Sequence, residues 1–220
     1  MLRGLRGDGT LRAKRRALLG AGRALEREGL VVGTVGNLSF RHRRTMYITP
    51  SQTAYGDLGP RDLVAIDLET GQLLSPGVPS RELPLHLAIY RARPDVGGIA
   101  HTHSLHATAW SFSGKSLEPR IEDLDYYGIA PVRTTRPARA GSIELGQVAV
   151  EGLGADAAVL LGDHGVLTVG PTIDRALLVA RVVERQAQIA WLVHHQDRRP
   201  VQQSVVTSRR GLHVMRGATH

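Results

Sequence analysis

The sequence predicts an α/β fold whose sheet is at least partly antiparallel. Two segments, 62–75 and 157–170, each contain two apolar runs around a short turn with glycine, which is typical of hairpins. Four other segments place apolar residues at helical spacing, so helices alternate with these strands along the chain. The 220 residues contain no internal repeat or low-complexity linker and can bury one sizeable core. We therefore expect a single domain over residues 1–220, with a basic N-terminal segment 1–10 and a polar, basic tail 197–220.

The N-terminal half alternates predicted helices with predicted strand pairs. Leucine and alanine recur at helical spacing over residues 11–30, which predicts an amphipathic helix. Residues 31–51 alternate between apolar and polar side chains, as paired strands joined by a turn containing glycine would. The hairpin over 62–75 comes next, and a helix over 82–94 follows, closed by Pro94.

The C-terminal half begins with a short buried strand in "VGGIAHTHS" (96–104), which leads into a short helix. Residues 113–140 are rich in proline, glycine and arginine, so we expect a loop with one strand. A helix is predicted over 143–154, before the second hairpin. The last predicted element is a long helix over 172–196, with Thr172 as its N-terminal cap.

The composition excludes several classes of protein. Cysteine is absent, so the chain has neither disulfides nor thiolate metal ligands, and any metal must bind to histidine and carboxylate. No run approaches the roughly 20 apolar residues that span a bilayer. The basic N-terminal residues lack the apolar core of a signal peptide. We expect a cytoplasmic protein that does not bind membranes.

The net charge of +8 comes from arginine, which supplies 26 of the 28 basic residues. A basic surface can bind nucleic acid or a phosphorylated small molecule, or it can follow from the arginine bias of a GC-rich genome. Here the basic residues are scattered except at the two ends, and only two Trp and two Phe are available to stack on bases. We therefore expect a phosphorylated small-molecule substrate and no nucleic acid.

Three of the ten histidines, His101, His103 and His106, lie within six residues of an otherwise apolar stretch. Side chains alternate along a strand, so His101 and His103 point to the same side, about 7 Å apart. That spacing allows two imidazoles to bind one metal ion. The alternative is a pair of histidines whose partners are protein groups.

Two further residues fit a metal site with an acid beside it. Glu82 begins a predicted helix, where the dipole favours a carboxylate, and His86 one turn later can orient it. The alternative for Glu82 is an ordinary capping acid. His164 lies between Gly162 and Gly165 and can reach across the sheet, although a turn histidine bonded to backbone is also possible. Three histidines with a carboxylate suit zinc, or another divalent first-row ion such as manganese.

Four motifs resemble the class II aldolase and adducin family in their order and spacing: "GTVGNLSFR", "ITPSQTAYGDL", "PSRELPLHLAIYRARPDVGGIAHTHS" and "DHGVLTVG". The resemblance covers roughly residues 11–195. It implies a three-layer α/β/α fold around a central, largely antiparallel or mixed sheet. It also implies that a divalent metal, most often zinc, binds to His101, His103 and His164, with Glu82 as the catalytic acid/base. His106, on the following helix, is then structural or supports one of the metal ligands.

The same resemblance implies loops that bind a phosphate, because glycine lets backbone N–H groups approach an anion closely. The residues it places there are Gly36, Asn37, Ser51, Ser80 and, where sugar-phosphate aldolases carry a second serine, Arg81. Without the resemblance, a hairpin turn at Gly36-Asn37 and a hydroxyl-bonded turn at Ser51 would explain them. The chain also departs from the family at Gln52 and Asp163, and no tyrosine follows Tyr127.

The resemblance implies a metal-dependent aldolase, a lyase of carbohydrate metabolism. It would cleave an L-fuculose-1-phosphate-like ketose 1-phosphate to dihydroxyacetone phosphate and an aldehyde, through a metal-stabilised enediolate. An epimerase or decarboxylase of a sugar (acid) phosphate could use the same site. A non-catalytic, adducin-like binding module is a third possibility, but it predicts lost metal ligands, and all three histidines are present. Family members form homotetramers with active sites at subunit boundaries, so we expect a homotetramer.

Overall fold

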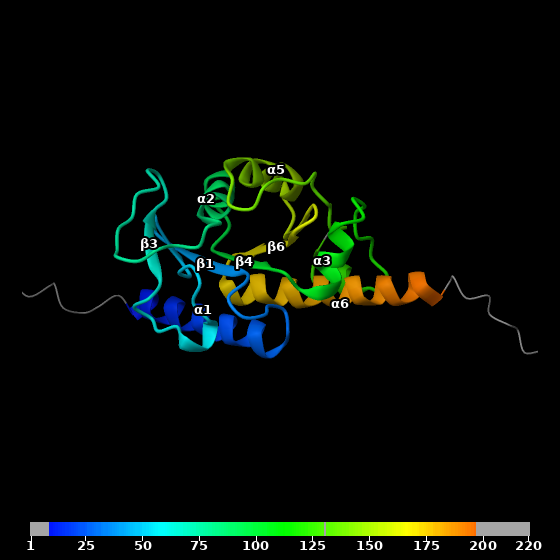
Figure 1. Cartoon of the computed structure of the whole chain (residues 1–220), viewed down its shortest axis with the longest axis horizontal. Coiled ribbons are helices and arrows are strands. Elements are labelled where there is room, and N and C mark those ends of the chain that lie inside the picture. Colours follow the sequence, from blue (N-terminus) through cyan, green and yellow to red (C-terminus); the bar gives the residue numbers. More distant parts are fainter. Residues whose placement is uncertain (1–8, 130, 197–220) are drawn as a thin grey trace, which may run out of the picture.

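A six-stranded antiparallel sheet forms the centre of the molecule (Figure 1). The computed structural model describes residues 9–129 and 131–196. Along the sheet the strands follow the order β3-β2-β1-β4-β6-β5, and every neighbouring pair is antiparallel. The strands are β1 (Asn37–His42), β2 (Thr45–Ile48), β3 (Val64–Asp67), β4 (Gly98–Thr102), β5 (Ala158–Leu161) and β6 (Gly165–Gly170).

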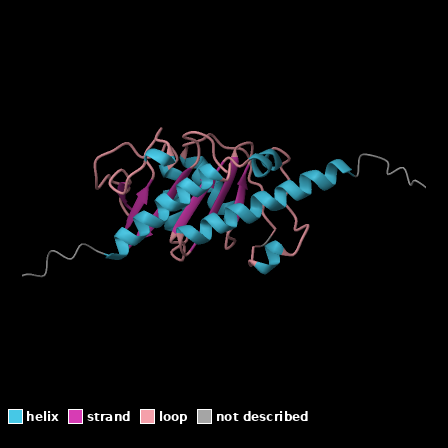
Figure 2. Ribbon diagram, turned by 90° about the horizontal axis from the view of Figure 1, so that it is seen from below, coloured by secondary structure: helices cyan, strands magenta, loops and turns pink. Residues whose placement is uncertain are grey.

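Helices cover both faces of this sheet (Figures 1 and 2). One layer contains α1 (Gly9–Arg27) and the long α6 (Ile173–Gln196), and the short α3 (Leu105–Ser111) packs against α6. The opposite layer contains α2 (Leu83–Ala92) and α5 (Ile143–Leu153). The predicted three-layer α/β/α fold with a largely antiparallel sheet is therefore confirmed. No helix among residues 9–129 and 131–196 is long and apolar enough to cross a bilayer.

The two apolar layers explain why β4 is buried on both faces. Leu85 and Ile89 of α2 pack with Val148 of α5 against one face of the sheet. Leu18 and Leu25 of α1 pack against the other. All five residues of β4 are buried, so a polar side chain on this strand must find its partners inside the protein. In the strand register His101 lies next to Asn37 of β1 and Leu167 of β6, at the end of the central strands.

The predicted helices are found with ends that differ by three residues or fewer. Thr172 caps α6 as predicted, since its hydroxyl accepts a hydrogen bond from the Arg175 N–H at 3.2 Å. Ser142 caps α5 in the same way, accepting from the Leu145 N–H at 3.0 Å. Residues 1–8 of the basic N-terminal segment and the tail 197–220 lie outside the described residues.

Three local predictions are wrong. The β1–β2 turn contains no glycine, because Arg43 adopts the left-handed conformation there (φ 57°) and the two glycines of 31–51 precede β1. The second arm of the 62–75 hairpin is only an isolated bridge between Ile66 and Leu73. Among the described residues of 113–140, isolated bridges and the short helix α4 (Asp123–Tyr126) replace the expected strand.

Candidate active site

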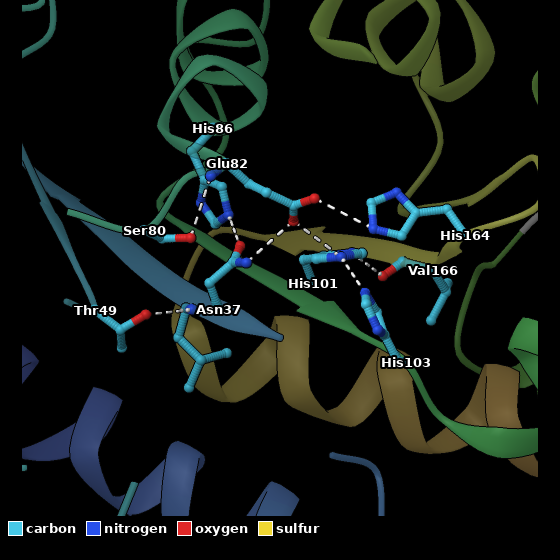
Figure 3. A network of polar contacts seen from close by, with 10 residues as sticks. Asn37, Thr49, Ser80, Glu82, His86, His101, His103, His164 and Val166 are labelled. Atoms are coloured by element: carbon cyan, nitrogen blue, oxygen red, sulfur yellow. Dashed lines mark hydrogen bonds and ion pairs between the residues drawn. The ribbon is translucent and has the colours of Figure 1, made fainter. Parts of the chain in front are cut away.

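Three histidines from two parts of the chain converge at the end of β4 (Figure 3). His101 lies on β4, His103 follows it by two residues, and His164 lies in the turn between β5 and β6. The three ring centroids are 4.8–4.9 Å apart, and the Nε2 atoms of His101 and His103 are 3.0 Å apart. One potential ligand nitrogen from each histidine lies within 4.8 Å of the other two, so the group could hold a metal ion.

Glu82 joins this cluster from the N-terminus of α2. It occupies the capping position, but its side chain makes no capping hydrogen bond. Its carboxylate instead turns toward the histidines, with Oε2 3.0 Å from His101 Nε2 and Oε1 3.2 Å from His164 Nε2 (Figure 3). The structure therefore excludes the capping explanation of this residue and places its carboxylate beside the three imidazoles.

The ionisation of this cluster is set by burial and by short contacts. Burial raises the pKa of Glu82, but the charge of His101 and hydrogen bonds from His101, His164 and Asn37 outweigh it and hold that pKa well below its usual range. Burial, together with repulsion from His101 and His164, lowers the pKa of His103 to about 4. His103 is therefore neutral at pH 7, with a lone pair available to a cation.

The donor set fits a divalent metal ion. The Nδ1–H of His101 donates to the Val166 carbonyl at 3.0 Å, so the ring turns its Nε2 toward the cluster. That nitrogen lies 3.0 Å from both Glu82 Oε2 and His103 Nε2, so imidazole nitrogens and a carboxylate oxygen meet at one point. Imidazole nitrogens with a nearby carboxylate are ligands that zinc and other first-row ions prefer.

The cluster forms one wall of a cavity of about 510 Å³. His101 is fully buried behind that wall, and the other predicted site residues all line the cavity. Among the described residues the lining consists of Thr34, Val35, Gly36, Asn37, Pro50, Ser51, Gln52, Ser80, Arg81, Glu82, His103, Ala140 and His164. No tyrosine is among these lining residues.

Two loop residues in the cavity have left-handed backbones. Gly36 has a φ of 76°, and a Cβ there would lie 2.8 Å from the His101 carbonyl oxygen, so only glycine fits. Gln52 has a φ of 56°, in a conformation that residues with a Cβ rarely adopt. Both residues line the cavity, next to Asn37 and Ser51 respectively.

Ser80 and Asn37 hold Glu82 in place. The hydroxyl of Ser80 accepts a hydrogen bond from the Glu82 backbone N–H at 3.2 Å. The amide nitrogen of Asn37 donates to Glu82 Oε2 at 3.0 Å, and its oxygen lies 2.6 Å from Nε2 of His86 (Figure 3). His86 thus reaches Glu82 through Asn37 and not directly, a link that the sequence analysis missed because it depends on how α2 packs against β1.

His106 lies outside the cluster, as the sequence analysis predicted. Its Nδ1 is 2.8 Å from Oε1 of Glu184, and its backbone N–H donates to the same oxygen. These contacts attach α3 to α6. Asp163 is exposed and has a φ of 56°, so it supplies the tight turn that presents His164.

Comparisons with known proteins place the chain in a family. The sequence profile described as "Class II Aldolase and Adducin N-terminal domain" matches residues 16–191, and the chain belongs to this family. The 5-methylthioribulose-1-phosphate/5-deoxyribulose-1-phosphate aldolase of Rhodospirillum rubrum is 35% identical over 179 residues, covering 81% of this chain and 80% of the relative. L-ribulose-5-phosphate 4-epimerase UlaF of Salmonella paratyphi C is 34% identical, covering 76% and 79%.

The fold agrees with this assignment. A solved structure of L-fuculose 1-phosphate aldolase superposes with a TM-score of 0.78 at 29% identity, covering 84% of this chain and 87% of that protein. The family thus contains relatives named for both aldol cleavage and epimerisation.

Proposed function

We propose that the protein is a metal-dependent aldolase that cleaves a ketose 1-phosphate to dihydroxyacetone phosphate and an aldehyde. The observation that carries this proposal is the convergence of His101, His103, His164 and Glu82 on one wall of a polar cavity. This arrangement combines a cation site with a buried carboxylate at the same point, which is what proton transfer next to a carbonyl group requires.

We propose that the three histidines hold a divalent ion, and that this ion is zinc, which prefers imidazole ligands.

 When bound, the ion would supply Lewis acidity for the negative charge that develops on substrate oxygens when the carbon–carbon bond breaks. The hydrogen bond from His101 Nδ1 to Val166 keeps that ring in the tautomer whose Nε2 faces the cluster.

Glu82 is the proposed acid/base. After cleavage, the carbon of dihydroxyacetone phosphate that was bonded to the aldehyde must receive a proton, and the reverse reaction must remove it. The Glu82 carboxylate lies on the cavity wall, is only 6% exposed and is fixed by Asn37 and Ser80. The low pKa of Glu82 comes mainly from His101 and His164, so it would rise once those imidazoles bind the ion. A fixed carboxylate shielded from bulk water could then carry this proton in both directions.

The cavity lining also supplies the proposed phosphate site. Ser51 and Ser80 offer hydroxyl donors beside Gly36, and Arg81 adds a guanidinium that can bind a phosphate through two hydrogen bonds. Asn37 also lines the cavity, but in this structure its side-chain amide bonds to Glu82 and His86.

The relatives support a sugar phosphate as substrate and leave two reactions to be separated. One relative is named as an aldolase of ketose 1-phosphates and another as a pentulose-phosphate epimerase. We propose aldol cleavage because the aldolase relative and the superposed aldolase structure both share the fold over most of the chain. We further propose a cytoplasmic homotetramer, and exposed Val32 and Val35 next to the cavity would suit a subunit contact.

The experiment that tests the proposal measures metal content together with deuterium exchange from solvent into dihydroxyacetone phosphate. We expect about one divalent ion per chain and an exchange that a chelator abolishes. Cleavage of L-fuculose 1-phosphate, 5-methylthioribulose 1-phosphate and 5-deoxyribulose 1-phosphate then identifies the aldehyde. Metal without exchange, combined with epimerisation of L-ribulose 5-phosphate, would replace the aldolase with the epimerase. A chain that binds no metal would favour a binding module.

A further inference from the structure

A chain of buried polar side chains leads from Glu82 into the layer between the sheet and α2. From Glu82 Oε2 it runs to the Asn37 amide nitrogen (3.0 Å), and from the Asn37 oxygen to His86 Nε2 (2.6 Å) (Figure 3). It continues from His86 Nδ1 to the Ser39 hydroxyl (2.6 Å) and from there to the Tyr90 hydroxyl (3.0 Å). None of these five residues is more than 6% exposed, so their hydrogen bonds must be made within the protein.

Chemistry fixes the direction of every hydrogen bond in this chain. The NH₂ group of Asn37 donates to Glu82 Oε2, which turns the Asn37 oxygen toward His86. That oxygen can only accept, so Nε2 of His86 carries the proton. Burial, assisted by the nearby charge of His101, lowers the pKa of His86 to about 3, so the ring is neutral and its Nδ1 is an acceptor.

The remaining two bonds follow from the state of His86. The Ser39 hydroxyl must donate to Nδ1, so its oxygen is free to accept from the Tyr90 hydroxyl. Each group therefore donates toward Glu82, from Tyr90 through Ser39, His86 and Asn37. Such a one-way series is cooperative, because each bond polarises the next.

His86 acts on Glu82 by fixing the orientation of the Asn37 side-chain amide. The two ends of an amide are nearly equal in size, so packing alone does not decide which end faces the carboxylate. A rotated amide would turn its oxygen toward Glu82, and a buried acceptor facing a carboxylate would lose its hydrogen bond. The proton on His86 Nε2 prevents this rotation, because it requires an acceptor at 2.6 Å.

We propose that His86 is a positioning residue for Glu82, acting through Asn37 to keep an N–H donor on the catalytic carboxylate. The inference rests on the proposed role of Glu82 as acid/base. The hydrogen bonds of His86 go to Asn37 and Ser39, so its substitution changes the setting of Glu82 and leaves the three imidazoles in place.

Two variants of His86 test this role. His86→Phe fills the site but cannot donate, and we expect deuterium exchange into dihydroxyacetone phosphate to fall about 10- to 100-fold in kcat, with metal content and KM little changed. His86→Gln retains an N–H donor and should recover most of the loss. Thr168→Val is the matched control, because it also removes buried hydrogen bonds but has none to the chain of residues described above. It should lower stability and leave exchange intact.

The path through Asn37 is tested by a double-variant cycle. In an Asn37→Ala background, His86→Phe should lower exchange by less than twofold, because its effect is transmitted through the missing amide. Full additivity of the two losses would overturn the proposal, as would a folded His86→Phe protein with exchange like that of the parent.

A spectroscopic measurement separates this inference from the proposed activity. In ¹⁵N NMR of the metal-free protein, His86 should be protonated on Nε2 only, and the Asn37 NH₂ should exchange slowly with water. Slow exchange of that group should be lost in His86→Phe and retained in His86→Gln. If the parent protein catalyses no exchange, the proposed function fails while these resonances still decide the role of His86; the opposite tautomer would overturn it.

Discussion

Glu82 is ionised because of its neighbours and in spite of its burial. A carboxyl group as enclosed as this one would normally hold its proton, since burial disfavours the charge. Two imidazoles at 3.0 and 3.2 Å and one amide reverse that preference. The same three contacts aim the carboxylate at the cavity, so the residue that begins α2 contributes to the site and not to the helix cap.

Substitution of Glu82 should separate metal binding from proton transfer. Glu82→Gln keeps the three imidazoles, so we expect a normal metal content and a loss of deuterium exchange of about 10²- to 10⁴-fold. His103→Ala removes a proposed ligand and should lose both. Metal analysis and exchange on the same preparations provide the check, and a Glu82→Gln protein with normal exchange would contradict the acid/base role.

Gly36 and Gly33 form a matched pair for measuring the fit of the substrate loop. Both have left-handed backbones, so Ala at either position should cost about 1 kcal/mol in conformational strain. At Gly36 the new Cβ would also lie 2.8 Å from the His101 carbonyl oxygen, whereas at Gly33 nothing lies within 4 Å. Urea unfolding should therefore show a loss of about 2–4 kcal/mol for Gly36→Ala and about 1 kcal/mol for Gly33→Ala. Equal losses would show that this contact relaxes freely.

At the scale of whole elements, α3 depends on a carboxylate from another helix. Glu184 of α6 accepts hydrogen bonds from the backbone N–H groups of His106 and Ala107, at 3.0 and 2.9 Å. These groups lie in the first turn of α3, where no intrahelical acceptor is available. Since α3 begins at Leu105, two residues after His103, these bonds also fix the segment that carries His103.

The attachment of α3 should depend on acidity. Burial raises the pKa of Glu184, but the His106 and Ala107 backbone N–H groups outweigh it and hold that pKa below its usual range. Because the folded pKa is depressed, the stabilisation is complete above the ordinary pKa and is lost as the pH falls through the lower, folded value. Glu184→Gln should cost about 1–3 kcal/mol at pH 7. In urea titrations the difference from the parent should shrink toward pH 3, and a constant difference would contradict this account.

At the scale of the whole molecule, the sequence predicted the features that a local repeat of apolar residues encodes. It missed contacts between elements that are far apart in the chain. Helical spacing located α1, α2, α5 and α6, and strand alternation brought His101 and His103 to one side. The link from Glu82 through Asn37 to His86 joins α2 to β1, and no periodicity encodes that pairing. The turn at Arg43 was missed because a non-glycine residue takes a left-handed conformation there, against its own preference.

The proposed metal should stabilise the whole fold, because its ligands come from β4, the segment after it and the β5–β6 turn. An ion that binds the folded chain alone adds RT ln(1 + [L]/Kd) to the free energy of unfolding, about 4 kcal/mol at a thousandfold excess over Kd. We expect a chelator to lower the melting temperature of the parent protein and zinc to restore it. His103→Ala should melt at the same temperature with and without zinc. If neither chelator nor zinc changes the melting temperature of the parent protein, these histidines hold no ion. An ion bound tightly by residues from several elements must stabilise the folded chain.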